Sequence, residues 1–188
     1  MNMLRSVVAV SFAKGPTIML SSGKQFDFLD PHNSEFDIED VAHGLAHVCR
    51  YAGQCRDFYS VAEHSLLVSD MVEDYAFEAL LHDAAEAFIG DITRPLKQLV
   101  PEFKRIEAEV EDAVIERFGM RRDYRATVKE ADLRVLAAEQ LQIMAPGCAD
   151  WAQQAGIEPA PIRVRHLRPS EAKREFLARF AKLCGIQS

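Results

Sequence analysis

The chain has 188 residues, 48% of them hydrophobic and 27% charged, and carries a formal net charge of -7 at pH 7. This length and composition predict a single globular domain with a sizeable core and exclude a disordered chain, while the acidic balance without a basic stripe argues against polynucleotide binding. No apolar run approaches a membrane span and the N-terminus lacks the pattern of a signal peptide, so we expect a cytoplasmic protein that binds no membrane.

The expected secondary structure begins with a short β-hairpin and continues as helices. Residues 17–20 and 25–28 flank a turn in which Gly23 supplies the required backbone geometry. Capping residues and glycines then mark the ends of helices. We expect these helices over 37–50, from Ser60 onwards, and over 77–89, where Gly90 ends the helix.

Two prolines organise the middle of the chain. Pro95 and Pro101 bracket a short helix and precede a long one over 102–118, which Gly119 ends. After it we expect a helix over 123–144, a loop rich in proline and glycine over 146–161, and a terminal helix from Ser170. The predicted fold class is therefore all-α with a short N-terminal β-hairpin, without internal repeats or a linker between domains.

The most unusual segment places a histidine and two carboxylates in an apolar helical run. Residues 79–86 read ALLHDAAE. On a helix, His82, Asp83 and Glu86 would fall on one arc, because residues three and four apart lie on one face. Burying carboxylates among leucines costs roughly several kcal/mol unless a cation compensates, so this arc suits a metal ion.

A second histidine and a further aspartate occupy the same kind of position. His64 shares its helix face with valine, leucine and methionine side chains, and Asp132 shares its face with two valines and a leucine. A single histidine on an apolar face is more often a hydrogen-bonded core residue than a ligand, and a single aspartate there is more often a buried acid or a cap. The ordered combination of these residues with the His82–Asp83 pair indicates a common site.

We therefore predict a metal site made of His64, His82, Asp83 and Asp132. Two imidazoles and two carboxylates form a mixed nitrogen and oxygen set that suits one divalent ion, such as Mn, Fe, Co, Ni or Zn. The sequence does not choose among these metals. His43 and His47 offer a second pair on one helix, but no acidic third ligand lies near them in the sequence.

These residues belong to a longer pattern that resembles the HD-domain metal-dependent phosphohydrolases, a family named for the adjacent His–Asp pair. The matching segments are CRY at 49–51, VAEHS at 61–65, LHDAAE at 81–86, GD at 90–91 and PLK at 95–97. They are similar to the bacterial 5'-deoxynucleotidase branch and to the phage deoxyadenosine triphosphate triphosphohydrolases. The resemblance covers residues 37–144. It implies a single HD-type domain, with a hairpin segment over 1–36, an HD core over 37–146, and a loop and C-terminal helix over 147–188.

The resemblance also implies roles for the acidic residues around the metal. It implies that the four predicted ligands bind the ion and that Glu86 and Asp91 lie beside the bound phosphate as the acid–base groups. Glu86, next to the ligand pair, could orient or deprotonate a water molecule, and Asp91 follows Gly90 at a helix end, where it could approach a leaving oxygen. Without the resemblance, Asp91 is interpreted as an ordinary turn aspartate.

Four further side chains are candidates for binding the substrate. The resemblance implies nucleotide contacts for Arg50 and Tyr51; the branch often has tryptophan where this chain has Tyr51. Arg94 and Lys97 are candidate anion binders, because a guanidinium grips phosphate through two hydrogen bonds and an ammonium acts as a point charge. Each also fits an ordinary role, on the surface for the cations and in the core for the aromatic ring.

Two other groups of residues predict structure rather than chemistry. The four cysteines have no spacing of a zinc knuckle or a redox motif, so we expect reduced thiols. The basic residues between Arg163 and Lys182 are interpreted as the solvated face of a terminal helix rather than as a phosphate or RNA surface.

We expect an HD-fold enzyme that uses one divalent metal ion to hydrolyse the phosphoester of a nucleotide, converting a deoxynucleoside 5'-monophosphate to deoxynucleoside and phosphate. Its partner is then a small-molecule nucleotide, while homo-oligomerisation stays open. One alternative is a triphosphohydrolase that releases triphosphate from a deoxynucleoside triphosphate. Another is a nucleotide-binding regulatory module without turnover, against which Glu86 and Asp91 argue because a site that only binds needs no acid–base groups.

Overall fold

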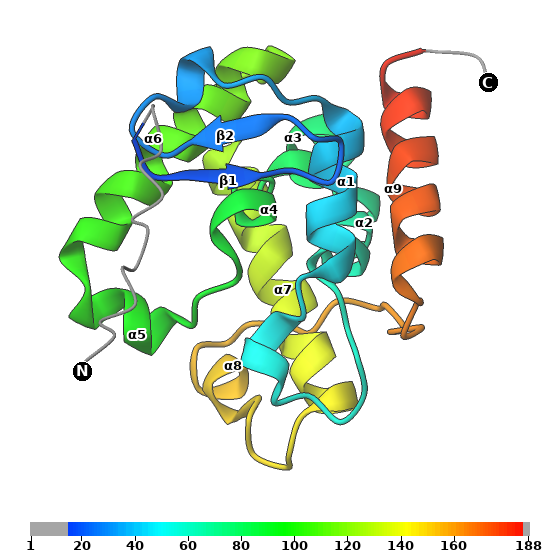
Figure 1. The fold of residues 1–188 in the computed structure, drawn as a ribbon. Helices are drawn as coiled ribbons and strands as arrows, with labels where there is room; N and C mark the ends of the chain where they lie inside the picture. The colour runs from blue at the N-terminus through cyan, green and yellow to red at the C-terminus, as the bar shows by residue number, and fades with distance from the viewer. Residues whose placement is uncertain (1–14, 186–188) are drawn as a thin grey trace, which may run out of the picture.

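The computed structural model describes residues 15–185, so the first fourteen residues of the expected N-terminal segment and the last three of the chain lie outside it. The fold is all-α with a short β-hairpin, as predicted, with 58% helix and 5% strand (Figure 1). Strand β1 (Thr17–Met19) pairs antiparallel with β2 (Gln25–Asp27), which confirms the hairpin. Gly23 has a φ of 85° in the turn between them, a conformation that glycine adopts without strain.

The helices follow in chain order, with long elements separated by short ones. They are η1 (Pro31–Asn33), α1 (Ile38–His47), η2 (Arg50–Gly53), α2 (Val61–Asp70), α3 (Ala76–Leu81), α4 (Glu86–Ile89), α5 (Arg94–Leu99), α6 (Pro101–Phe118), α7 (Arg125–Ile143), α8 (Asp150–Gln154) and α9 (Pro169–Leu183). Within residues 15–185, no helix is long and apolar enough to cross a membrane.

The predicted caps form as their residue types dictate. Asp37 accepts hydrogen bonds from the backbone N–H groups of Glu39 and Asp40, and Ser60 accepts one from Glu63. These bonds satisfy donors that would otherwise be unpaired at the first turns of α1 and α2. At the other end of a helix, Gly119 stops α6 in the left-handed conformation.

Two predicted helices differ from the structure. The helix expected over 37–50 ends at His47, because the chain becomes extended at Val48 and Cys49 then pairs with Ser60 as an isolated bridge. The helix expected over 77–89 breaks into α3 and α4. Residues 82–85 form turns in which N–H groups bond three residues back, and the His82 ring bonds the carbonyl of Ala79.

The loop expected over 146–161 contains a short helix, α8, that the sequence did not predict. It is held against α7 by a hydrogen bond of 2.7 Å from the indole Nε1 of Trp151 to Oε1 of Gln140. The neighbouring Ala152 is buried. Tertiary contacts therefore stabilise a helical turn in a segment whose prolines and glycines indicate a loop.

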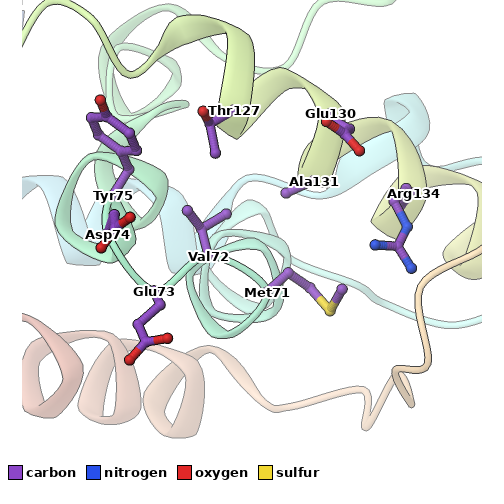
Figure 2. Close-up of a pocket in the computed structure, with 9 residues that line it drawn as sticks. All are labelled: Met71, Val72, Glu73, Asp74, Tyr75, Thr127, Glu130, Ala131 and Arg134. Carbon is purple, nitrogen blue, oxygen red and sulfur yellow. The ribbon is translucent and has the colours of Figure 1, made fainter.

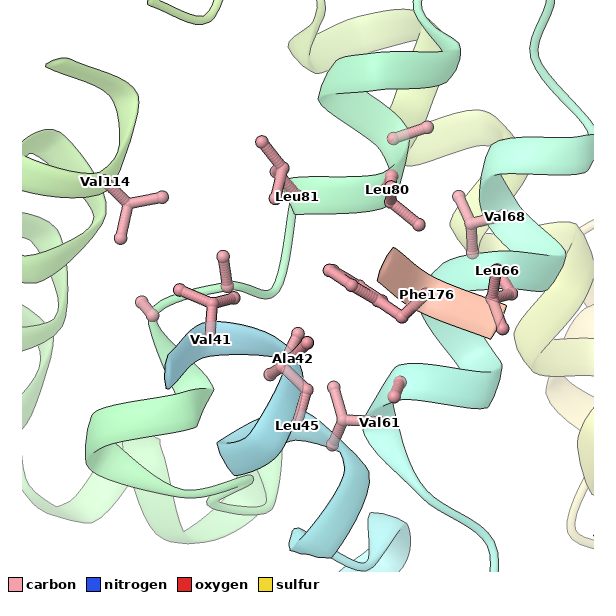
Figure 3. Close-up of a cluster of buried hydrophobic side chains, with 14 of the residues drawn as sticks. Val41, Ala42, Leu45, Val61, Leu66, Val68, Leu80, Leu81, Val114 and Phe176 are labelled. Carbon is pink, nitrogen blue, oxygen red and sulfur yellow. The ribbon is translucent and has the colours of Figure 1, made fainter. Parts of the chain in front are cut away.

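One apolar core joins the hairpin, the central helices and the terminal helix. It runs from Phe26 in β2 to Phe176 in α9, both fully buried. Phe26 stacks on Phe88 of α4 with ring centroids 4.1 Å apart, and Figure 3 shows Phe176 among the side chains of α2 and α3. Gly44 lets α1 approach α4, since a Cβ there would lie 2.7 Å from Ala87. This packing sets the positions of α2, the turn before α4, and α7.

Candidate metal centre

The four residues predicted as metal ligands converge at one place. His64 lies on α2, His82 and Asp83 lie in the turn between α3 and α4, and Asp132 lies on α7. Nε2 of His64 lies 3.3 Å from an Asp132 carboxylate oxygen and 3.5 Å from an Asp83 oxygen. Nε2 of His82 lies 3.3 Å from the same Asp83 oxygen. The ligand atoms of His64, His82 and Asp83 all lie within 4.8 Å of one another, and together they could hold a metal ion.

The two imidazoles are oriented as metal ligands are. Nδ1 of His64 lies 2.6 Å from Glu139, and Nδ1 of His82 lies 2.7 Å from the carbonyl oxygen of Ala79. In the neutral form of each ring, Nδ1–H donates to this oxygen and the lone pair is on Nε2. Both Nε2 atoms are buried and have no hydrogen-bond partner among the described residues. Two orphaned imidazole nitrogens beside two carboxylates fit a divalent ion.

Sequence reasoning missed Glu139, which connects the cluster to its surroundings. Its fully buried carboxylate accepts hydrogen bonds from His64, from the Tyr59 hydroxyl at 2.5 Å and from the Tyr51 hydroxyl at 2.7 Å. Glu139 follows Asp132 by two helical turns and so lies on the same face of α7. The inward-face reasoning applied to Asp132 would have found it. A carboxylate behind a ligating histidine fixes its tautomer and ring orientation.

The electrostatics of the cluster favour a bound cation. Burial opposes ionisation of Glu139, yet His64 and Arg50 hold its pKa at about 2. Burial likewise opposes ionisation of Asp83, but the neighbouring imidazoles and Arg50 hold its pKa well below its usual range. Burial and Arg50 lower the pKa of His64, but Glu139 and Asp132 outweigh them and raise it to about 9. The carboxylates thus attract positive charge to Nε2, where a metal ion and a proton would compete.

Glu86 and Asp91, the predicted acid–base groups, lie at the start of α4 and just after its end. Glu86 begins the helix; its side chain is buried, and its Oε2 has no hydrogen-bond partner among the described residues. Burial raises the pKa of Glu86 well above its ordinary value, and the charges of Asp83 and Asp91 raise it further. Asp91 follows Gly90 and accepts a hydrogen bond of 3.2 Å from the backbone N–H of Tyr51. The structure therefore brings both carboxyl groups to the cluster.

Arg50 and Tyr51 lie beside these carboxylates and line one cavity together with Asp91. The buried Arg50 guanidinium lies 3.5 Å from Asp83 and 3.4 Å from Glu139, and its Nε has no hydrogen-bond partner among the described residues. Tyr51 and Ala52 both adopt left-handed conformations, with φ of 58° and 51°. Two consecutive non-glycine residues in that region are strained, and such strain is common at functional sites.

The structure distinguishes the other two candidate anion binders. The exposed Arg94 lines the same cavity as Arg50, and no hydrogen bond or ion pair of its side chain is found within residues 15–185. Lys97 is engaged: its ammonium bonds Glu107 and lies 3.9 Å from Glu86. Lys97 therefore neutralises carboxylates beside the cluster and is less available than Arg94 to an incoming phosphate.

The cluster opens to solvent on two sides. A cavity of about 390 Å³ is lined by Arg50, Tyr51, Asp91 and Arg94, and a smaller hollow of about 250 Å³ is lined by His82, Asp83 and Asp132. A third hollow, of about 290 Å³, lies between α7 and the α2–α3 connection (Figure 2). It contains none of the predicted site residues. The two hollows at the cluster are therefore the ones with access to its chemistry.

The remaining sequence candidates have structural roles. The rings of His43 and His47 stack with centroids 4.2 Å apart, and neither belongs to the group that could hold a metal. Several residues of the basic C-terminal region form ion pairs, including Arg165 with Glu175 and Lys173 with Glu39. The four cysteines are free thiols.

The fold and the cluster together define a helical protein with a candidate His–Asp metal centre. The chain is similar to YfdR of Escherichia coli K12, at 38% identity over 168 residues that cover 88% of this chain and 94% of that protein. It is also similar to RCAP_rcc00048 of Rhodobacter capsulatus, at 36% identity over 180 residues that cover 84% of this chain and 90% of that protein. The chain belongs to the family of these two proteins. No family model matches it.

Proposed function

We propose that this protein is an HD-type metal-dependent phosphohydrolase that acts on nucleotides, with a deoxynucleoside 5'-monophosphate as its substrate. The observation that carries the proposal is the pair of buried imidazole nitrogens without hydrogen-bond partners, which meet Asp83 and Asp132 in a cluster where Oε2 of Glu86 also has no partner among the described residues. Because orphaned polar atoms are costly in a core, their concentration at one place supports a bound ion and a bound anion. The motif resemblance supplies the reaction class.

His64, His82, Asp83 and Asp132 would hold the ion. A divalent metal supplies polarisation of the phosphoryl oxygen and lowers the pKa of a bound water to about 7. Glu86 orients the attacking water and takes its proton. Asp91, held by the backbone of Tyr51, lies where it can deliver a proton to the leaving oxygen. The phosphorus–oxygen bond to the sugar breaks, and one water molecule is consumed for each phosphate released.

Arg50 is suited to hold the phosphate. Its guanidinium is always charged and is already directed at the cluster by Asp83 and Glu139. The free Arg94 at the cavity rim adds a second positive charge. These two cations offset the acidic balance of the site and favour an anionic substrate over a neutral one.

The test is elemental analysis combined with phosphorus NMR of the products. The protein, reloaded with Mn, Co, Ni or Zn and incubated with a panel of nucleoside mono- and triphosphates, should contain about one equivalent of metal and release phosphate. Release of triphosphate would identify the triphosphohydrolase instead, and metal binding without any product would identify a binding module. Less than about a tenth of an equivalent of metal after reloading would contradict the metal centre.

Two substitutions separate the ligands from the acid–base group. Asp83→Asn should lose metal and hydrolysis together, whereas Glu86→Gln should keep the metal and reduce turnover by roughly a hundredfold or more. Glu109→Gln, on an exposed position of α6, is the matched control and should change neither. If Glu86→Gln loses the metal while Asp83→Asn keeps it, the two roles are reversed.

A further inference from the structure

The cavity beside Arg50 has two chemically different walls. Arg50 and Asp91 form a polar wall next to the metal cluster. The apolar part of the lining includes Leu133 and Leu136 of α7 and Trp151 of α8. Small-molecule sites have this composition, a largely apolar surface with a few polar groups, and the cavity volume of about 390 Å³ lies in their range.

Trp151 is not part of the hydrophobic core. It is half-buried and belongs to neither of the two core clusters formed by the described residues. Its ring is instead fixed at the cavity by the hydrogen bond from its Nε1 to Gln140. An indole fixed at a cavity wall offers a flat face for stacking. Tyr51 is less free for this purpose, because its hydroxyl is bound to Glu139.

The same hydrogen bond determines which end of the Gln140 amide is available to a ligand. An indole N–H can only donate, so the amide oxygen of Gln140 must face Trp151. The amide nitrogen is left with its donors, and no hydrogen bond from it is found within residues 15–185. Gln140 lines the cavity, so it offers N–H donors to a ligand atom that accepts. Acceptors on an aromatic ring are a general property of nucleobases.

We propose that this cavity is the nucleobase subsite, in which Trp151 stacks on the base and Gln140 donates a hydrogen bond to its edge. The inference rests on the proposed function, because it assumes that the phosphate of the same ligand lies at Arg50 and the metal. It makes α8 a specificity element, although the motif resemblance ends before this helix.

The first experiment uses tryptophan fluorescence, because Trp151 is the only tryptophan in the chain. A deoxynucleoside without phosphate, added to the metal-loaded protein, should change the emission saturably, whereas inorganic phosphate should not. Absence of any change with deoxynucleosides and with deoxynucleotides would overturn the subsite. If no phosphoester is hydrolysed, the proposed function fails, yet this titration still decides whether a base binds beside Trp151.

The second experiment measures selectivity between a deoxynucleoside monophosphate and glycerol phosphate, which has no ring. Trp151→Ala should lower the ratio of the two kcat/KM values by roughly five- to 150-fold, the range expected for a lost stacking contact. Trp151→Phe should retain most of the ratio. The control Leu141→Ala, at an exposed leucine of α7 outside the cavity, should leave it unchanged. An unaltered ratio in Trp151→Ala would overturn the subsite.

Discussion

Glu63 and His64 are adjacent on α2 and both are fully buried, yet their surroundings differ. The two oxygens of Glu63 accept hydrogen bonds from the backbone N–H groups of Arg165 and Leu167, at 2.6 Å and 2.7 Å. One nitrogen of His64 is bound to Glu139, and the other has no partner among the described residues. Burial of a polar side chain therefore does not by itself identify a functional site; at His64 it is the unsatisfied Nε2 beside two carboxylates that indicates a ligand.

The same difference holds for the two regions around these residues, the segment before α9 at Glu63 and the metal centre at His64. Glu63 joins α2 to the segment before α9, and His166, between its two donors, has a left-handed φ of 55°. We call the Glu63 region closed, because both carboxylate oxygens accept hydrogen bonds from the backbone segment that they order. We call the metal centre open, because the Nε2 atoms of His64 and His82 have no hydrogen-bond partner among the described residues. The first region should respond to mutation through stability and the second through ligand binding.

The largest expected effect separates the two regions by stability. Glu63→Ala removes two charge-assisted hydrogen bonds from a fully buried carboxylate, so it should lower the free energy of unfolding by about 3 to 5 kcal/mol. Denaturant unfolding measures this change. Glu175→Ala, which removes the partly exposed partner of Arg165, should cost less than about 1 kcal/mol. If both variants lost the same free energy of unfolding, Glu63 would not be what anchors the segment before α9.

The next effect concerns metal affinity. Glu139→Gln weakens the acceptor behind His64 and should reduce metal affinity by roughly ten- to a hundredfold, as outer-shell substitutions typically do. Calorimetric titration with Mn or Ni provides the measurement. Glu63→Gln is the matched control on the neighbouring closed carboxylate and should leave the affinity unchanged. A comparable loss in the control would mean that the two regions are coupled through α2.

The smallest expected effect is on the stability contributed by Glu78, a buried carboxylate whose partner Arg121 is exposed. Burial opposes ionisation of Glu78 on α3, but hydrogen bonds from the side chain and backbone of Arg121 outweigh it and hold its pKa below the ordinary value of 4.5. Because the folded state has the lower pKa, the stabilisation is present above pH 4.5 and is lost as pH falls through the folded value. At neutral pH, Glu78→Gln should be less stable than the wild type by about 1 kcal/mol.

Thermal unfolding at a series of pH values checks this prediction. The difference between Glu78→Gln and the wild type should shrink as the pH drops below the ordinary glutamate value, because the wild-type carboxyl then becomes protonated as well. A gap that stays constant across the acid range would mean that Arg121 does not act through the charge of Glu78.

The sequence was informative wherever a polar residue interrupted an apolar face. His64 and Asp132 were predicted to point inward for that reason, and the structure brings them within 3.3 Å of each other. Glu139 obeys the same rule and was missed because no motif directed attention to it. The hairpin and the capped ends of α1 and α2 followed from local turn and cap chemistry, which depends on few residues.

Features that depend on tertiary contacts were not predictable in this way. The break between α3 and α4 leaves the helical periodicity of residues 77–89 intact, so the pattern alone indicated one helix. The break is associated with the hydrogen bond between the His82 ring and the carbonyl of Ala79, which the sequence pattern does not encode. Likewise, α8 depends on Trp151 meeting Gln140 across the fold. The roles of Arg50 and Tyr51 came from the motif resemblance and not from periodicity.

Gly44 shows how a position without chemistry can constrain the site. A methyl group there would lie 2.7 Å from the Cβ and carbonyl oxygen of Ala87 and 2.8 Å from its Cα, and backbone atoms cannot rotate aside. Ala87 directly follows Glu86, so the added volume would be transmitted to that carboxyl through a single peptide unit. In a random mutagenesis screen read out by activity, Gly44 should therefore rank with the polar residues of the cluster. In an alanine scan, Gly44→Ala should reduce activity as strongly as the loss of a reactive side chain, because the added methyl group would collide with Ala87.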